Sequence, residues 1–99
     1  MVDETDWPWD QVKNAASVTT WQVLRDEAPV TVVIHYSDDH SWAFLGGEGF
    51  TLDDAALVSM AEVSSRDPTL REVADLEPGW VARRTHVGAV WTREFDPEM

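Results

Sequence analysis

The strongest structural signal in the chain is a β-prone run at residues 30–36, bounded by residues that favour turns. Pro29 precedes the run, and Ser-Asp-Asp follows it at 37–39. Valine, isoleucine and tyrosine are typical of strands, and such boundaries mark where a strand starts and stops. A second run at 41–45 ends at Gly46-Gly47. Because a short polar connection between two β-prone runs is typical of a hairpin, we expect an antiparallel strand pair here.

A second hairpin is expected near the end of the sequence. Pro78-Gly79 breaks the chain, and two β-prone segments at 80–85 and 90–95 then flank Gly88. Strand-forming residues on both sides of a glycine predict another antiparallel pair.

The sequence predicts two short helices between the hairpins, near residues 60–66 and 68–75. Ser59 and Glu62 have the spacing of a capping box, in which each side chain bonds to the backbone of the other residue. Asp67 suits an N-cap and Pro68 suits the first position of a helix. Both starts are therefore marked by residues that satisfy free backbone N–H groups.

These elements predict an α+β fold, with a small antiparallel sheet built from two hairpins and two short helices packed on one face. A chain of 99 residues suits one domain over residues 1–99. Residues 1–15 form an acidic segment with tryptophans, which we expect to be peripheral. We expect the core beneath the helices to contain Val32, Ile34, Leu70 and Val73.

Six tryptophans are available to build a core, because each indole ring buries a large apolar area. Trp42 and Phe44 share one face of their predicted strand, since side chains alternate along a strand, and we expect them to be core residues. Trp7 and Trp9 lie in the acidic segment, and we expect these two to be the most exposed. Tryptophan also anchors protein interfaces, which is the alternative role for an exposed ring.

The charge balance limits the possible partners. The chain has 7 Lys+Arg against 19 Asp+Glu, a formal charge of −12, and it has no cysteine. Binding to nucleic acid or to an anionic membrane surface needs clustered positive charge, so neither partner is expected. The acidity serves either solubility alone or the attraction of a basic protein.

Nothing in the sequence predicts an enzyme. No Gly-x-Ser-x-Gly elbow is present, and no base can be paired with a nucleophile. The histidines, His35, His40 and His86, are interpreted as structural or solvent-exposed. We therefore expect no catalytic residue and no cofactor.

Two short motifs could suggest a bound ion, and both are better explained by turns. Asp38, Asp39 and His40 are adjacent, whereas a metal site needs several convergent ligands. The loop Gly46-Gly47-Glu48-Gly49 has an acid and no lysine, so it is a poor cradle for phosphate. We expect no metal site.

The start of the chain is acidic and lacks the basic and apolar regions of a secretory signal. The longest apolar run, at 30–34, is far shorter than the roughly 20 residues that span a bilayer. The expected location is the cytoplasm.

From about residue 30 to residue 80 the chain resembles an uncharacterised bacterial α+β family that has been placed among the immunity proteins of polymorphic toxin systems. The residues that carry the resemblance form the pattern D-x-x-W-x-F-x-G-x-E, with Asp39, Trp42, Phe44, Gly46 and Glu48. Further matching segments lie at 58–60, 67–70 and 78–82. The resemblance implies toxin neutralisation by protein binding, with no catalytic residue to carry over.

The sequence thus predicts a non-enzymatic acidic domain that binds another protein, with a basic toxin domain as the expected partner. The expected partner-binding residues are the acids around the hairpin ends, Asp38, Asp39, Glu48 and Asp53. The alternative is a small accessory domain that binds a small ligand in an aromatic pocket. An enzyme is the third alternative.

Overall fold

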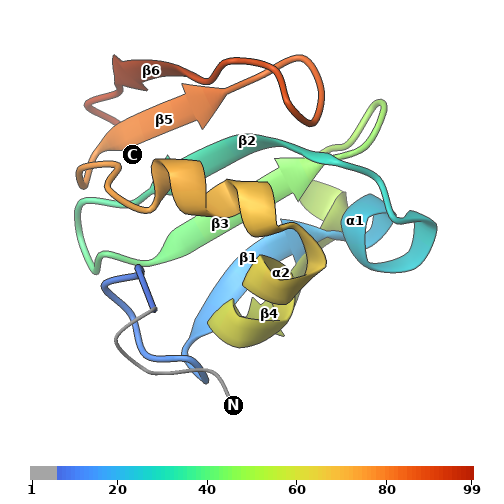
Figure 1. Ribbon diagram of the computed structural model, residues 1–99, viewed down its shortest axis with the longest axis horizontal. Coiled ribbons are helices and arrows are strands. Elements are labelled where there is room, and N and C mark those ends of the chain that lie inside the picture. Colours follow the sequence, from blue (N-terminus) through green and yellow to red (C-terminus); the bar gives the residue numbers. More distant parts are fainter. Residues whose placement is uncertain (1–6) are drawn as a thin grey trace.

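A computed structural model describes residues 7–99, except for the side chain of Leu52. It shows one six-stranded sheet in the order β4-β1-β3-β2-β5-β6 (Figure 1). The strands are β1 (Ala16–Thr20), β2 (Val30–His35), β3 (Trp42–Gly46), β4 (Ala55–Ser59), β5 (Trp80–Arg83) and β6 (Thr92–Phe95). The α+β class is therefore confirmed. Asp3, Glu4 and Asp6, the first acids of the segment expected to be peripheral, lie outside the described residues.

The sheet is mixed, so the expectation of a purely antiparallel sheet was wrong. The β2–β3 and β5–β6 pairs are antiparallel, as predicted, but β1 pairs in parallel with β3. The reason is topological. After the hairpin, β3 runs opposite to β2 and lies between β2 and β1, where its direction is the same as that of β1. On its other side β1 pairs antiparallel with β4 over five residue pairs.

Two buried threonines reinforce the parallel junction between β1 and β3. The hydroxyl of Thr19 donates to the carbonyl of Phe44 at 2.7 Å, and that of Thr20 donates to the carbonyl of Gly46 at 2.6 Å. Both side chains are almost inaccessible to solvent. Their hydroxyl groups therefore add hydrogen bonds across a ladder whose register joins only Val18 to Ala43 and Thr19 to Phe44.

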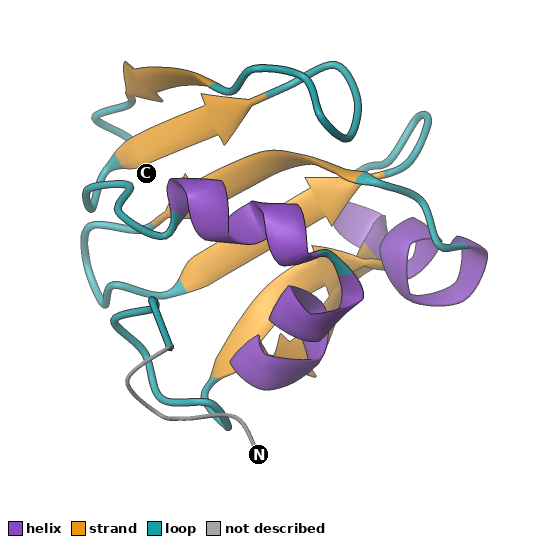
Figure 2. Ribbon diagram, viewed as in Figure 1, coloured by secondary structure: helices purple, strands orange, loops and turns teal. Residues whose placement is uncertain are grey.

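The helical elements are α1 (Trp21–Asp26), η2 (Leu52–Asp54), α2 (Met60–Arg66) and η3 (Pro68–Val73). The side chain of Ser59 accepts a hydrogen bond from the Glu62 amide, as predicted for the start of α2. The Asp67 side chain caps η3 by accepting from the Thr69 amide. This second helix is a 3₁₀ helix, and α2 and η3 lie across the same face of the sheet (Figure 2).

The core beneath these helices contains Val33 in place of the expected Val32 and Ile34. Val33 is fully buried in the same cluster as Leu70 and Val73. Ile34 is also buried, but with Ala43 and Val81 in a second cluster, against which Val32 packs. Side chains of a strand alternate between faces, and nearly every residue of this strand is apolar or β-branched, so the pattern could not choose the face.

Trp9 was expected to be exposed, and that expectation was wrong. Only 6% of its surface is accessible to solvent. The centre of its ring lies 4.9 Å from that of Trp42 and 5.4 Å from that of Phe44, and both contacts are edge-to-face. Trp42 and Phe44 are fully buried, as predicted. The N-terminal segment thus supplies part of the core. Burying the indole ring removes a large apolar area from water, although charged residues lie beside it in the sequence. Trp7 is half-buried.

Within residues 7–99, every helix is too short or too polar to cross a membrane.

Candidate functional site

Three segments that are distant in sequence meet at the end of β2. The amide of Gly79 donates to the carbonyl of His35 at 2.7 Å, and the amide of Asp96 donates to the carbonyl of Gly79 at 2.8 Å. Both the amide and the hydroxyl of Ser37 donate to the carbonyl of Met99. The β2–β3 turn, the turn at 77–79 and the segment 96–99 therefore form one surface.

This surface is rich in carboxylates and has no cation of its own. Residues 36–41, 77–79 and 96–99 include no lysine or arginine. We name the surface the acidic end, defined by the carboxylates of Asp38, Asp39, Glu77, Asp96 and Glu98. All of these side chains are exposed except that of Asp96, which is half-buried.

Asp38 and Asp39 also hold the β2–β3 turn in shape. Asp38 accepts from the Asp39 amide, and Asp39 accepts from the Ser41 amide at 2.9 Å. Hydrogen bonds from Ser41 hold the pKa of the Asp39 carboxyl below its usual range, so it stays ionised. Burial, followed by the charges of Asp38 and Asp39, raises the pKa of the neighbouring Tyr36 phenol.

Next to the acidic end, Asp10 joins two buried aromatic rings. One oxygen of its carboxylate accepts from Trp42 Nε1 at 2.7 Å, and the other lies 2.9 Å from His35 Nε2. His35 Nδ1 donates to the carbonyl of Leu76 at 2.7 Å, and the ring stacks on Trp42 with 3.9 Å between centroids. His35 Nε2 is close to Asp10 but not aligned with it for a hydrogen bond.

His35 is thus a core residue that anchors the N-terminal segment, whereas His40 and His86 are exposed. The ring of His40 lies 5.8 Å from that of His35, and its backbone has a φ of 59° in the turn. Among residues 7–99, no three His, Cys, Asp or Glu side chains are grouped so that they could hold a metal ion.

Glu48 and Asp53 lie away from Asp38 and Asp39. Glu48 lies in the loop after β3 and Asp53 lies in η2, whereas Asp38 and Asp39 lie in the turn before β3, so a whole strand separates the two pairs (Figure 1). The structure brings Asp38 together with Asp39, but it does not bring all four predicted residues onto one surface.

Asp54 was not predicted as a site residue, yet it organises the loop after β3. Its carboxylate accepts from Gln22 Nε2 at 3.0 Å and from the Thr51 amide at 2.9 Å. The hydrogen bond from Gln22 is the larger cause that lowers the pKa of Asp54. A charged carboxylate therefore stands directly before β4.

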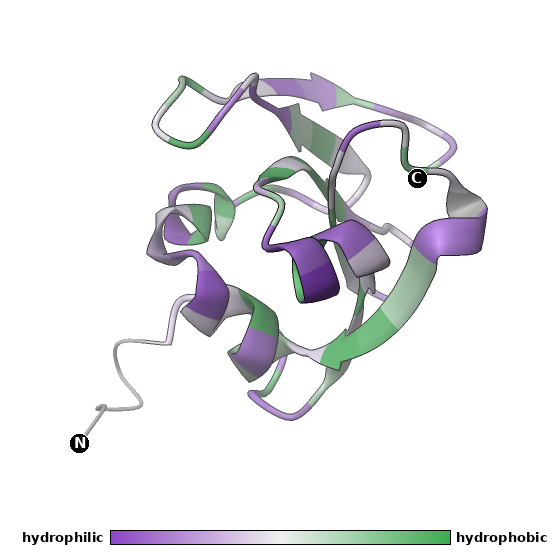
Figure 3. Ribbon diagram, turned by 90° about the vertical axis from the view of Figure 1, so that its right-hand side faces the viewer, coloured by the Kyte–Doolittle hydropathy of each residue, from purple (hydrophilic) through white to green (hydrophobic). Residues whose placement is uncertain are grey.

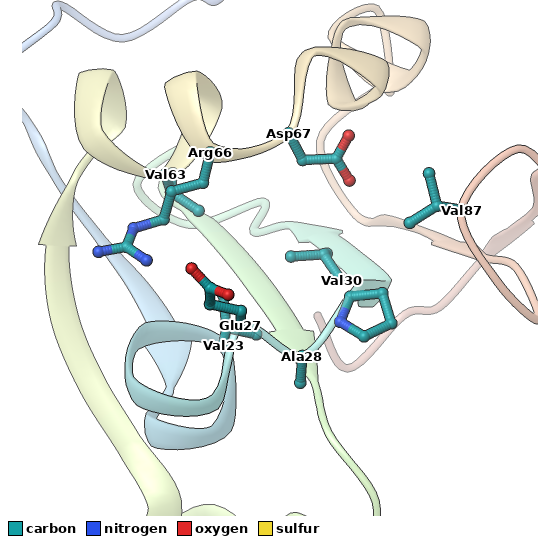
Figure 4. A pocket seen from close by; sticks show the side chains of 9 residues that line it. Val23, Glu27, Ala28, Val30, Val63, Arg66, Asp67 and Val87 are labelled. Atoms are coloured by element: carbon teal, nitrogen blue, oxygen red, sulfur yellow. The ribbon is translucent and has the colours of Figure 1, made fainter.

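A separate groove of about 410 Å³ lies between α1, α2, the start of β2 and the loop that joins β5 to β6 (Figure 4). Its wall is aliphatic, and Glu27 and Arg66 lie at its rim. The lining residues are Val23, Glu27, Ala28, Pro29, Val30, Val63, Arg66, Asp67 and Val87. This groove has no aromatic side chain, so it differs from the aromatic pocket that a ligand-binding accessory domain was expected to have.

The backbone of Glu27 is strained at this groove. It has a φ of 56°, which costs a residue with a side chain about 1–2 kcal/mol. The position closes α1, with the Ala28 amide returning to the carbonyl of Gln22 at 3.0 Å. The strain is therefore explained by the end of the helix.

Sequence reasoning missed Arg84, the most buried charged side chain among residues 7–99. Its guanidinium is fully buried, 2.7 Å from Asp67 Oδ2 and 2.8 Å from the Thr69 hydroxyl. Arg84 Nε donates to the carbonyl of Val30 at 3.0 Å, and the group lies 4.2 Å from the centre of the Trp91 ring. Burial opposes the ionisation of Asp67, but hydrogen bonds from Thr69 and Arg84 outweigh it and lower the pKa. This pair therefore holds η3 against β2 and β5.

The fold and its surfaces define a small α+β domain with an acidic end and an aliphatic groove. Compared with known proteins, the chain matches no family model, no curated protein and no solved structure.

Proposed function

We propose that this chain is a non-enzymatic binding domain for a basic protein, and that the partner is a toxin domain which it neutralises in the cytoplasm. The proposal is based on the concentration of exposed carboxylates at the acidic end. Three segments converge there, and none of them contributes a lysine or an arginine. Exposed charges of one sign attract a partner of the opposite sign and accelerate its association.

The carboxylates of the acidic end are also held in place. Asp38 and Asp39 accept backbone hydrogen bonds within the turn, and Asp96 accepts from the Glu98 amide at 3.0 Å. Ordered acceptors lose less conformational freedom on binding than mobile ones do. They suit the guanidinium and ammonium groups of a basic surface, including one that would otherwise bind the phosphates of a nucleic acid.

The chain offers two variants with equal loss of charge for the test. Asp38→Asn/Asp39→Asn removes two carboxylates from the acidic end, and Asp26→Asn/Glu48→Gln removes two that lie elsewhere, at the end of α1 and in the loop after β3. The immobilised wild-type protein first captures its partner from the host, and stopped-flow mixing then compares the association rates of the three forms.

We expect the pair at the acidic end to lower the association rate by about two- to fivefold at low salt, and the control pair to change it less. The difference should shrink at physiological salt, where charges are screened beyond about 8 Å. Equal effects of both pairs would mean that net charge alone attracts the partner. Capture of only acidic or neutral proteins would overturn the proposal.

A further inference from the structure

The two edges of the sheet differ in how they are protected. β6 carries Arg93 and Glu94, which pair with Asp75 and Arg83 respectively, and Pro97 follows it closely. The other edge is β4, whose sequence Ala-Ala-Leu-Val-Ser has neither a charge nor a proline. Figure 3 shows this contrast as an apolar β4 and a polar β6. Charged residues and prolines are the usual means of preventing another strand from pairing with an edge, and β4 lacks both.

The hydrogen bonds between β1 and β4 indicate which backbone groups face outward. The Met60 amide donates to the carbonyl of Ala15 at 2.9 Å, in the same register that pairs Ser17 with Val58. Because bonded and non-bonded pairs alternate in an antiparallel ladder, Ala56 and Val58 bond to β1. The backbone N–H and C=O groups of Ala55 and Leu57 therefore point away from the sheet. Within residues 7–99, no strand pairs with this side of β4.

The centre of this edge also presents an apolar side chain. Leu57 keeps 75% of its accessible area, although it lies beside Val18 in the middle of the β1–β4 ladder. A strand added to β4 would cover this side chain and would bond to the outward groups at the same time.

Negative charges lie beyond both ends of β4. Asp53 and Asp54 directly precede the strand, and Glu62, whose carboxylate lies 3.6 Å from the exposed Arg66, is in the first turn of α2 after it. In an antiparallel pair of two copies centred on Leu57, the Asp53 end of one copy would approach the Glu62 end of the other. Each copy also has a charge of −12, so a second copy of this chain is disfavoured. The same carboxylates favour a strand with cations at its ends.

We propose that β4 is a docking edge for an extended segment of the basic partner, with apolar or β-branched residues at its centre and lysine or arginine at its ends. The segment adds a further strand to the sheet, with main-chain hydrogen bonds supplying affinity and Leu57 and the flanking carboxylates supplying selectivity. This inference rests on the proposed function, because it names how part of that partner binds.

Two synthetic peptides test the edge directly. The basic probe is acetyl-Lys-Thr-Val-Thr-Val-Thr-Lys-amide, and the matched control has glutamate in place of both lysines. Each is titrated into the ¹⁵N-labelled protein while amide chemical shifts and hydrogen exchange are recorded. We expect the basic peptide to shift the amides of β4 and to slow exchange at Ala55 and Leu57, with a much smaller effect from the acidic peptide.

Variants at one position separate the backbone contribution from that of the side chain. Leu57→Pro removes an outward N–H while leaving the bonds to β1, and Leu57→Thr keeps that N–H as the matched control. Loss of one hydrogen bond should weaken binding of the basic peptide to L57P by about three- to tenfold relative to L57T. If L57P does not fold, Leu57→Lys replaces it, and its added cation should reverse the preference between the two peptides.

Each other outcome contradicts the inference in its own way. Shifts at the acidic end with none in β4 would overturn the docking edge and leave the proposed function standing. Equal binding of both peptides would overturn the chemistry assigned to the partner, and no shift at millimolar peptide would overturn the edge itself. A dimer in sedimentation that is lost in L57P would make a second copy the occupant.

Discussion

At the scale of single residues, the Arg84–Asp67 pair has more influence on stability than the many surface charges. Only 14% of the Asp67 side chain and none of the Arg84 side chain is accessible. The exposed pair of Glu62 and Arg66 has 3.6 Å between its closest atoms and contributes little, as most surface pairs do. A buried charge is costly to leave without its partner.

Arg84→Met should therefore lower the free energy of unfolding by about 3–5 kcal/mol, because it leaves the Asp67 charge without its buried partner. Urea titration measures this loss, and the double variant Arg84→Met/Asp67→Asn should lose less than the sum of the single variants.

Because the pKa of Asp67 is lowered, the contribution of this pair to stability depends on pH. The contribution is complete above the usual carboxyl pKa of 3.8 and is lost as the pH falls through the lower pKa of the folded state. This acid-dependent loss should be smaller in Arg84→Met. If the free energy of unfolding falls equally with decreasing pH in both proteins, the Asp67 carboxylate is not stabilised by Arg84.

At the scale of elements, local pattern located the strands whose limits are marked by turn residues. β2 and β3 lie close to the predicted 30–36 and 41–45, because Pro29 and the Asp-rich turn fix their ends. The expected sheet had no place for β1 and β4, because the parallel pairing of β1 depends on where β3 inserts. No local signal contains that information.

The same limit applies to the candidate site. Asp38 and Asp39 could be predicted from the sequence as neighbours on one surface, because both lie in the turn of a single hairpin. Glu77, Asp96 and Glu98 reach the same surface only through the sheet order, which sequence spacing does not reveal.

Gly46 shows how closely β3 approaches the start of β2. A Cβ atom at this position would lie 2.0 Å from the carbonyl oxygen of Pro29, which is backbone and cannot rotate away. Gly46→Ala should therefore cost about 3 kcal/mol in thermal or urea unfolding, near the upper end for overpacking. Gly49→Ala is the control: its Cβ would meet open space, and only the left-handed backbone penalises it, by about 1 kcal/mol. Equal costs would contradict the close approach.

At the scale of the whole molecule, a charge of −12 on 99 residues opposes the folded state through self-repulsion. Raising sodium chloride from about 20 mM to about 500 mM screens this repulsion and should raise the melting temperature by a few degrees. Scanning calorimetry of the wild type and of the two charge-reduced pairs measures the effect, and both variants should gain less from salt than the wild type does. A melting temperature that falls with salt would mean that attractive exposed pairs such as Arg93–Asp75 dominate instead.

The threonine hydroxyls between β1 and β3 have a consequence for how the molecule opens. The parallel ladder there is the only strand pairing in the described sheet that joins β4 and β1 to the other four strands, and Thr19 and Thr20 reinforce it with side-chain bonds. Met60 and Val63 of α2 belong to the same buried cluster as Val33, Trp42 and Phe44, so packing as well as hydrogen bonding holds the β1–β4 pair to the rest of the domain. A strand bound to β4 would be connected to the other four strands through this one junction. Opening of the junction would therefore release β4 and its bound strand together.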